Sequence, residues 1–147
     1  MTDERILDDF VGFELRRAYV WSSRRFSEML AGAAVKPGQY SLLLTIDRHP
    51  GETLGVIAER LALDPANLAP LLNELESLGY VERVVHPSDR RARAIQLKPS
   101  GRKALEQSHA AIAAHEARLT EGLSPADKTK LLKLLRKVTE NVRDDAE

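Results

Sequence analysis

Apolar residues recur at helical spacing through residues 5–30, among them Leu7, Phe10, Trp21 and Met29. The pattern predicts one helix of about 25 residues, roughly twice the usual length. Its apolar surface exceeds what a lone helix can use, which favours packing against a partner chain. Packing of this long helix on its own domain is the alternative.

Shorter helices are predicted over residues 39–48 and 54–61, separated by the helix-ending sequence His-Pro-Gly at residues 49–51. Thr53 is a candidate N-cap for the second of these. Its apolar side chains are expected to face the core: Val56, Ile57 and Leu61.

A further helix is predicted over residues 65–78, with leucines spaced three and four apart. Asp64 is a candidate N-cap, Pro65 occupies the first helical position, and Gly79 suits a left-handed C-terminal residue. Two short helices joined by a tight turn, the second one amphipathic, are typical of a helix-turn-helix.

After this helix the spacing of apolar residues changes to a period of two, which predicts strands at residues 80–85 and 92–97 joined by a turn. Ile95 and Leu97 fall on one face of the second strand. A hairpin directly after a helix-turn-helix is a wing.

Helical spacing returns at residues 100–121 and again after Ser124, a candidate N-cap. The expected fold is mainly α with one small β-hairpin: a winged helix-turn-helix core flanked by N- and C-terminal dimerisation helices. The expected divisions are an N-terminal dimerisation helix (1–34), a DNA-binding domain (35–99) and C-terminal dimerisation helices (100–147).

Composition limits the classes of function. The 147 residues are 43% hydrophobic and 30% charged, with 22 basic and 22 acidic side chains, so any affinity for nucleic acid must be local. The absence of cysteine excludes disulfides, thiolate metal sites and thiol-based sensing. With neither a signal peptide nor an apolar run of membrane-spanning length, a soluble cytoplasmic protein is expected.

Positive charge gathers in the predicted wing, where residues 83–103 hold seven Lys or Arg against one acid, Asp89. This patch is suited to phosphate binding; a solvated hairpin with loose ion pairs is the alternative. Arg90 and Arg91 lie at the predicted tip, and arginine suits a narrow minor groove. Asp89 either orients one of these guanidinium groups or caps the turn.

The helix over residues 65–78 is the candidate reader of the major groove. It has no Lys or Arg, so affinity would depend on the wing and on helix N-termini. Asparagine can pair with adenine and small apolar groups can contact thymine methyls, although solvated asparagines are the alternative. Pro70 should remove one helical hydrogen bond and bend the axis. The outward positions are Ala66, Asn67, Ala69, Pro70, Asn73 and Glu74.

Catalytic and metal-binding patterns are absent from the sequence. The four histidines lack metal-ligand spacing, no nucleophile motif occurs and no glycine loop is suited to phosphate. We therefore expect no enzyme activity, no cofactor and no metal site.

The sequence resembles the MarR family of bacterial transcriptional regulators. The resemblance rests on NLAPLLNELESLGYVER at residues 67–83, HPSDRR at 86–91, IQL at 95–97 and PSG at 99–101. It implies a homodimeric repressor, or sometimes an activator, in which the terminal helices of two chains interlock. Two reading helices would then enter successive major grooves of a pseudo-palindrome, while Arg91, held by Asp89, enters the minor groove.

Particular residues are predicted to form the DNA contacts and a ligand site. Many members of the family release DNA when a small aromatic or phenolic ligand binds, and the natural pocket would lie between the first, second and fifth helices. The residues predicted to contact DNA are Ala66, Asn67, Ala69, Pro70, Asn73, Ser88, Asp89, Arg90, Arg91 and Arg93. The residues predicted to line the pocket are Phe13, Arg17, Trp21, Tyr40 and His109.

Three positions depart from the family pattern. Lys98 replaces the usual threonine N-cap, and Asn73 and Glu74 stand where basic residues are frequent. Two other functions stay open: a winged-helix protein-interaction module without sequence-specific DNA binding, and a metal-sensing regulator that uses histidine and carboxylate ligands.

Overall fold

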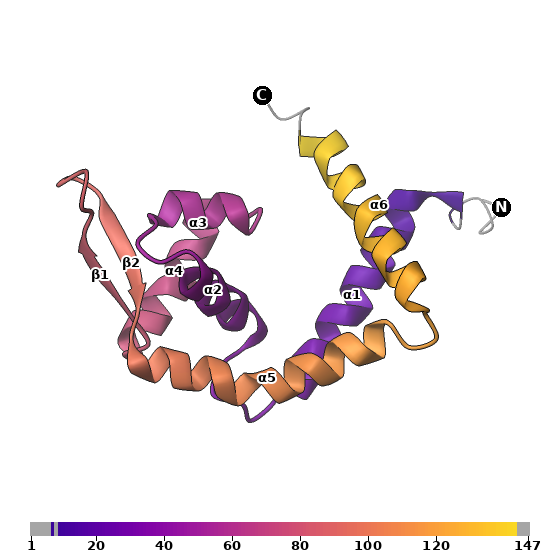
Figure 1. Ribbon diagram of the computed structural model, residues 1–147, viewed down its shortest axis with the longest axis horizontal. Helices are drawn as coiled ribbons and strands as arrows, with labels where there is room; N and C mark the ends of the chain where they lie inside the picture. Colours follow the sequence, from indigo (N-terminus) through magenta and orange to yellow (C-terminus); the bar gives the residue numbers. More distant parts are fainter. Residues whose placement is uncertain (1–6, 8, 144–147) are drawn as a thin grey trace. The chain divides into compact units, whose positions relative to one another are not determined.

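The computed structural model describes residue 7 and residues 9–143, which fall into two compact units, one up to Ala113 and one from Ala114 onward. The helix α5 begins in the first unit and ends in the second. The elements, shown in Figure 1, are α1 (Val11–Met29), α2 (Pro37–Arg48), α3 (Leu54–Arg60), α4 (Pro65–Ser77), β1 (Val81–Val85), β2 (Arg93–Leu97), α5 (Pro99–Leu119) and α6 (Pro125–Arg143). Their order and types agree with the sequence prediction.

The start of the first helix was predicted too early. Phe10 has an extended backbone (φ −94°, ψ 117°) and acts as N-cap, so α1 begins at Val11. The backbone N–H groups of Phe13 and Glu14 both donate to the Phe10 carbonyl, which forms the first turn there. Residues 5, 6 and 8 of the predicted helix lie outside the described part of the chain.

The helix-turn-helix is formed by α3 and α4. The Asp64 side chain accepts a hydrogen bond from the Ala66 backbone N–H at 2.8 Å, which confirms it as an N-cap. Thr53 takes the N-cap position of α3 without a side-chain cap bond. Between the two helices Ala62 has a φ of +53°, a left-handed backbone that ends α3 sharply.

The prediction that Val56 faces the core was wrong, because its side chain is 40% exposed. The inward face of α3 is formed by Ile57 and Ala58, flanked by the partly buried Leu54 and Leu61. These four residues are spaced i, i+3, i+4 and i+7 and therefore lie on one face of the helix. Val56 lies about 100° around the helix axis from Ile57, the nearest of them.

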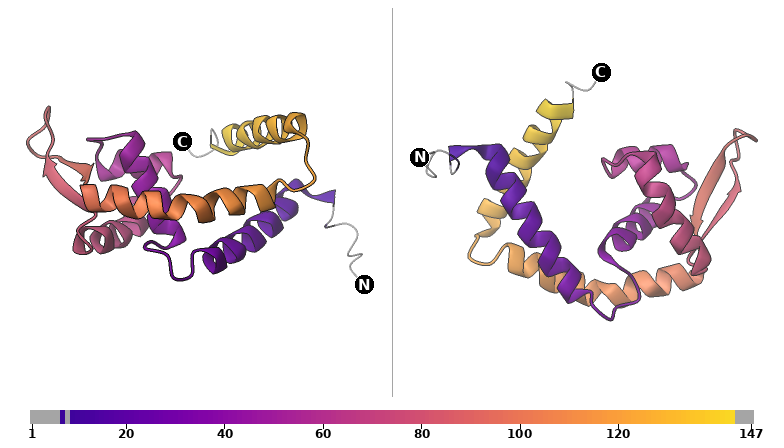
Figure 2. Two further views of the ribbon diagram at one scale, coloured as in Figure 1. Left: turned by 60° about the horizontal axis from the view of Figure 1, so that its bottom comes forward. Right: turned by 180° about the vertical axis from the view of Figure 1, so that it is seen from behind.

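The wing is a two-stranded antiparallel hairpin in which Val81 pairs with Leu97 and Val85 with Arg93. Figure 2 shows its tip extending away from α2, α3 and α4. The chain just before α3 joins the far side of β2: the Ile95 N–H donates to the Glu52 carbonyl at 2.9 Å, and the Gly51 N–H donates to the Ile95 carbonyl at 3.2 Å. The base of the wing is therefore hydrogen-bonded to the helix-turn-helix.

The core of the first unit joins α2, α3, α4, the hairpin and the start of α5. Burial of these apolar side chains fixes α4 with one face inward and the other free. The largest fully buried apolar side chains are Leu42, Leu43, Ile46, Ile57, Leu68, Leu72, Leu75, Val81 and Ile95.

The start of α5 approaches the end of α4 very closely. The Lys98 N–H donates to the Tyr80 carbonyl at 2.9 Å, and the Ser100 hydroxyl donates to the Gly79 carbonyl at 2.6 Å. Gly101 follows, and an added Cβ there would overlap the same Tyr80 carbonyl. Glycine is needed at this position because two backbones are in contact.

The two terminal helices have no buried residues, although both are rich in apolar side chains. On α1, Tyr19 is 72% exposed and Trp21 59%; on α6, Leu134 is 52% exposed and Val142 65%. The N-cap prediction for α6 is confirmed, because the Ser124 hydroxyl accepts a bond from the Asp127 backbone N–H. None of the described helices is both long and apolar enough to span a bilayer.

Candidate nucleic-acid interface

The outward face of α4 is the one predicted from the leucine spacing. Leu68, Leu72 and Leu75 are fully buried. The predicted contact residues lie on the other side, with Ala66, Asn67, Pro70 and Asn73 exposed and Ala69 half-buried. The helix continues through Pro70 to Ser77. A short helix with small side chains and asparagines on its free face can enter a major groove.

One of these residues, Asn73, and the neighbouring Glu76 are bound to a cation from another element. The Arg83 side chain on β1 reaches back to α4, where its Nη2 donates to the Asn73 Oδ1 at 2.6 Å. The Arg83 Nε lies 3.3 Å from a carboxylate oxygen of Glu76. The sequence analysis counted Arg83 only as part of the basic wing. Its contacts with α4 depend on the turn at residues 78–80, which the periodicity does not describe.

Glu74 is likewise bound by residues outside α4. The Gln39 side chain, 4% exposed, donates its Nε2–H to a Glu74 carboxylate oxygen at 2.8 Å and accepts the Lys36 backbone N–H at 3.0 Å. The Lys36 ammonium lies 3.8 Å from the same carboxylate. Both acids of α4 therefore have a positively charged neighbour, which reduces the repulsion that phosphates would meet.

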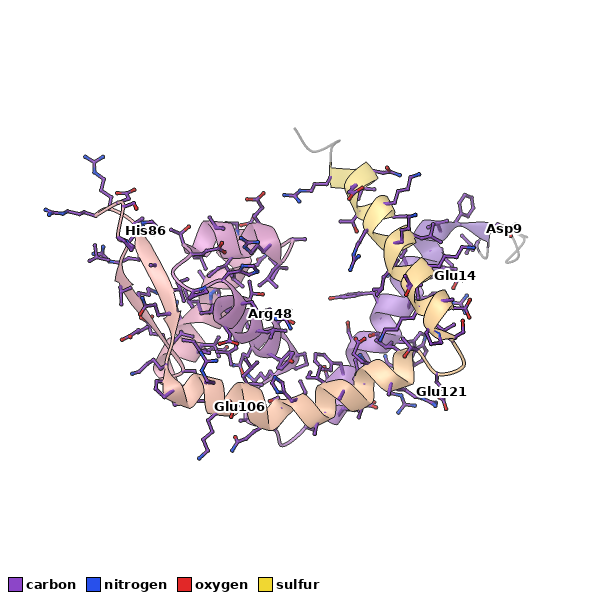
Figure 3. All side chains as sticks on the ribbon, in the orientation of Figure 1. Asp9, Glu14, Arg48, His86, Glu106 and Glu121 are labelled. Atoms are coloured by element: carbon purple, nitrogen blue, oxygen red, sulfur yellow. The ribbon has the colours of Figure 1, made fainter. Side chains whose placement is uncertain are left out.

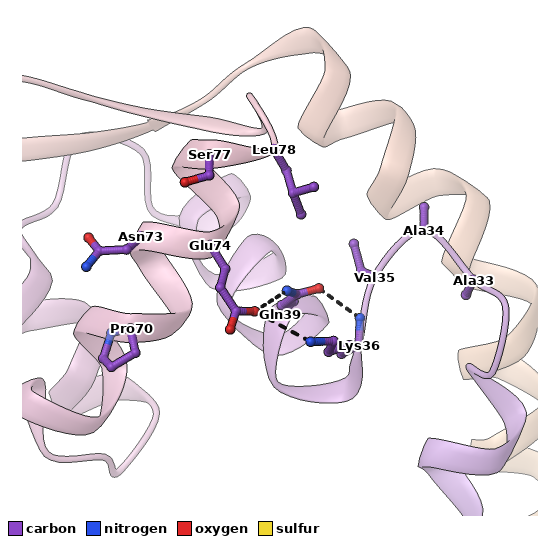
Figure 4. Close-up of a pocket in the computed structure, with 10 residues that line it drawn as sticks. All are labelled: Ala33, Ala34, Val35, Lys36, Gln39, Pro70, Asn73, Glu74, Ser77 and Leu78. Carbon is purple, nitrogen blue, oxygen red and sulfur yellow. Dashed lines mark hydrogen bonds and ion pairs between the residues drawn. The ribbon is translucent and has the colours of Figure 1, made fainter.

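An open groove of about 710 Å³ lies between α4 and the segment that precedes α2. Figure 4 shows Glu74 directed toward Gln39 and Lys36, whereas Asn73 leaves α4 in a different direction. None of the residues predicted to form a ligand pocket lines this groove. Its lining is Ala33, Ala34, Val35, Lys36, Gln39, Pro70, Asn73, Glu74, Ser77 and Leu78.

All five predicted contact residues of the wing are exposed: Ser88, Asp89, Arg90, Arg91 and Arg93. Figure 3 shows side chains projecting from the hairpin tip beyond the labelled His86. Asp89 caps the turn, because its carboxylate accepts the Arg91 backbone N–H at 2.9 Å. Among the described residues, no ion pair joins Asp89 to a guanidinium group, so the capping alternative describes this structure.

The charge of the wing tip is left uncompensated. Within the described part of the chain, neither Arg90 nor Arg91 forms an ion pair with a carboxylate. Arg93 donates weakly to the carbonyls of Arg90 and Ala92, at 3.3 and 3.4 Å. Guanidinium groups held on a projecting turn can bind phosphates or enter a minor groove.

The predicted ligand pocket is only partly assembled by the structure. The rings of Tyr40 and His109 meet edge to face, with centroids 6.5 Å apart. Phe26, which the sequence analysis did not select, meets Tyr40 in the same way at 6.4 Å. Burial raises the pKa of the Tyr40 phenol, an effect that the nearby Arg48 charge opposes. These three rings link α1, α2 and α5.

The other predicted pocket residues interact along α1 itself. The Arg17 guanidinium lies 5.6 Å from the Phe13 ring centroid and 2.9 Å from the Glu14 carboxylate. Trp21 is exposed and lies beneath the Arg24 guanidinium at 5.0 Å. The assignment of Phe13, Arg17 and Trp21 to a ligand site stays a prediction. A search of the described residues finds no group of three metal-ligating side chains.

A free helix face beside a cationic hairpin defines the class of winged helix-turn-helix DNA-binding proteins. A family model described as "MarR family" matches residues 35–92. A Thauera aromatica protein described as a putative transcriptional regulatory protein for the hcr operon is 29% identical over 93% of this chain and 81% of its own length.

Two solved structures of repressors named CouR resemble this chain over most of its length. The transcriptional repressor CouR bound to a 23-mer DNA duplex is 31% identical, with a TM-score of 0.85, over 95% of this chain and 99% of that one. CouR from Rhodococcus jostii RHA1 bound to p-coumaroyl-CoA is 27% identical, with a TM-score of 0.81, over 90% and 93%. The chain belongs to the MarR family: it is a DNA-binding transcriptional regulator and not an enzyme.

Proposed function

We propose that the chain is a homodimeric repressor that binds a pseudo-palindromic operator and is released by a small aromatic or phenolic ligand. The observation that carries this proposal is the uncompensated cationic wing tip beside the exposed face of α4 on one compact unit. Each chain supplies one such surface. In a two-fold symmetric dimer, the second chain places the same surface on the next major groove, provided that the half-site centres are about 34–36 Å apart.

Dimerisation is supported by the exposed apolar faces of α1 and α6. An exposed apolar face on each helix is typical of an interface with another protein. We assign residues 1–34 and 100–147 to that interface and residues 35–99 to DNA binding. Because both reading surfaces must fit one duplex, a ligand that changes their separation would weaken both half-sites together.

The class of ligand is proposed from the cluster of Phe26, Tyr40 and His109. An edge-to-face aromatic group with a phenol and an imidazole suits a planar ring that carries polar substituents. CouR, whose structure contains p-coumaroyl-CoA, supports a phenolic acid or its coenzyme A thioester. Phe13, Arg17 and Trp21 are the additional residues that we assign to this site.

The central test is DNA binding by the wing. Arg91→Ala should weaken binding to the duplex upstream of the protein's own gene by about 1–3 kcal/mol, roughly 5- to 150-fold, and reduce the salt slope by about one. Arg25→Ala, which removes an exposed cation from α1, is the charge-matched control; once sedimentation shows that this variant still forms a dimer, its DNA binding should change little. Equal losses for both variants, or salt-independent binding, would indicate a protein-interaction module instead.

Ligand release is tested separately on the preformed complex. We expect p-coumaroyl-CoA, p-coumarate or 4-hydroxybenzoate to dissociate the wild-type complex at a concentration that Tyr40→Phe raises. Tyr40 is a buried core residue, so loss of DNA binding in its variant without any ligand would show that its role is structural and would remove it from the ligand site.

A further inference from the structure

The geometry points to Arg83 as a positioning residue that fixes which way the Asn73 carboxamide faces, so that Asn73 presents its N–H donors to DNA. The inference rests on the proposed DNA binding by α4. It concerns the bond between β1 and α4, which joins two side chains ten residues apart in sequence.

The orientation of Asn73 follows from donor and acceptor chemistry. A guanidinium group has five N–H donors and no acceptor, so only the carbonyl oxygen of an asparagine can face it. The Nη2 to Oδ1 distance of 2.6 Å is that of a strong, charge-assisted hydrogen bond. The amide NH₂ of Asn73 is therefore directed away from Arg83.

Glu76 holds the guanidinium in place. Its carboxylate oxygen lies 3.3 Å from the Arg83 Nε, so the arginine is bound at two different nitrogen atoms by two side chains of α4. Binding at both nitrogens restricts the rotation of the planar group. The side chains of Arg83 and Glu76 are 35% and 41% exposed, and the hydrogen bond to Asn73 places Arg83 beside the outward face of α4.

This arrangement changes the base contact that the sequence suggests. A free asparagine pairs with adenine by donating to N7 while its oxygen accepts from the N6 amino group. Here Arg83 lies on the oxygen side of the carboxamide, and the NH₂ group faces outward. Asn73 should therefore favour the base edge that presents two acceptors, guanine with O6 and N7.

The full-length protein is first used to select the duplexes that it binds from a random-sequence library. These selected duplexes are the probe. We expect the position that loses its preference in Asn73→Ala to be a G·C pair in the wild-type consensus. An A·T pair at that position would overturn the inference while leaving the proposed function intact. Failure of the wild-type protein to enrich any sequence would overturn both.

A double-mutant cycle then separates positioning from other roles of Arg83. Arg83→Lys keeps the positive charge beside Glu76 but loses the planar fork. In the wild-type background it should weaken binding to the selected duplex about 3- to 10-fold and relax the preference at the Asn73 position. In the Asn73→Ala background it should have almost no effect on affinity.

Two alternatives give different results. If Arg83 contacts phosphate, Arg83→Lys weakens binding equally in both backgrounds and relaxes no base preference. If Arg83 only stabilises the fold, its variant lowers the unfolding midpoint without relaxing any base preference. Asn73→Asp provides a second check, because it keeps the acceptor for Arg83 and deletes the donor. It should lose at least 10-fold in affinity while the unfolding midpoint stays at or above that of wild type.

Discussion

The contact between Gly101 and the end of α4 allows a sharp stability prediction. A Cβ built on Gly101 would overlap the Tyr80 carbonyl oxygen, and it would lie 3.0 Å from the carbonyl carbon and 2.8 Å from the Leu97 Cδ1. The carbonyl cannot move away easily, because it accepts the Lys98 N–H at 2.9 Å. Gly101→Ala must therefore shift the start of α5 relative to β1 or break that bond.

The expected magnitude is the difference between two opposing effects. Overpacking by one methyl group typically costs about 1–3 kcal/mol, and a clash with backbone belongs at the upper end or above. Alanine regains up to about 1 kcal/mol of helix propensity over glycine. We therefore expect Gly101→Ala to lower the free energy of unfolding by about 2 kcal/mol, a large part of a total that is usually about 5–15 kcal/mol.

Gly55→Ala is the matched control, because Gly55 also lies in the first turn of a helix and nothing lies within 4 Å of its Cβ position. It should be neutral or stabilising by up to about 1 kcal/mol. Denaturant unfolding followed by far-UV circular dichroism, at one protein concentration for all variants, measures both. If Gly101→Ala were as stable as Gly55→Ala, the close approach of α5 and β1 would be refuted.

Three further predictions concern a cap, an ion pair and the terminal helices. Asp64→Ala should cost about 0.5–2 kcal/mol of unfolding free energy, because it removes the bond to the Ala66 N–H, and Asp64→Asn should restore most of it. The hydrogen bond from Arg60 holds the pKa of the Glu52 carboxyl below its ordinary value of 4.5. That contribution is present above pH 4.5 and disappears as pH falls through the lower folded-state pKa, so the stability difference between wild type and Arg60→Gln should shrink on acidification. The wild-type protein should sediment as a dimer at micromolar concentration and Leu134→Glu as a monomer, while a monomeric wild type would contradict the interface on the terminal helices.

Local features of the amino-acid sequence were sufficient to predict the order of the helices and strands and the concentration of positive charge in the wing. Leucines three and four apart on α4, the cap at Asp64 and the change of period at the wing are local signals, set by backbone geometry and by which face must avoid water. They were enough to predict both the outward face of α4 and the exposed wing tip. They did not predict that Val56 is exposed, because seven residues are too few for the apolar pattern to define which face of α3 is buried.

Which residues far apart in the sequence contact one another could be seen only in the folded chain. The Arg83 side chain binds α4, Gln39 and Lys36 bind Glu74, and the Glu52 backbone carbonyl accepts the Ile95 N–H at the base of the wing. Each of these contacts joins different parts of the chain. A periodic pattern shows which face of an element is buried but not which residue of another element lies opposite, since that depends on how the core packs. The same reason explains why α4 needs no cation of its own: its positively charged neighbours come from β1 and from the segment before α2.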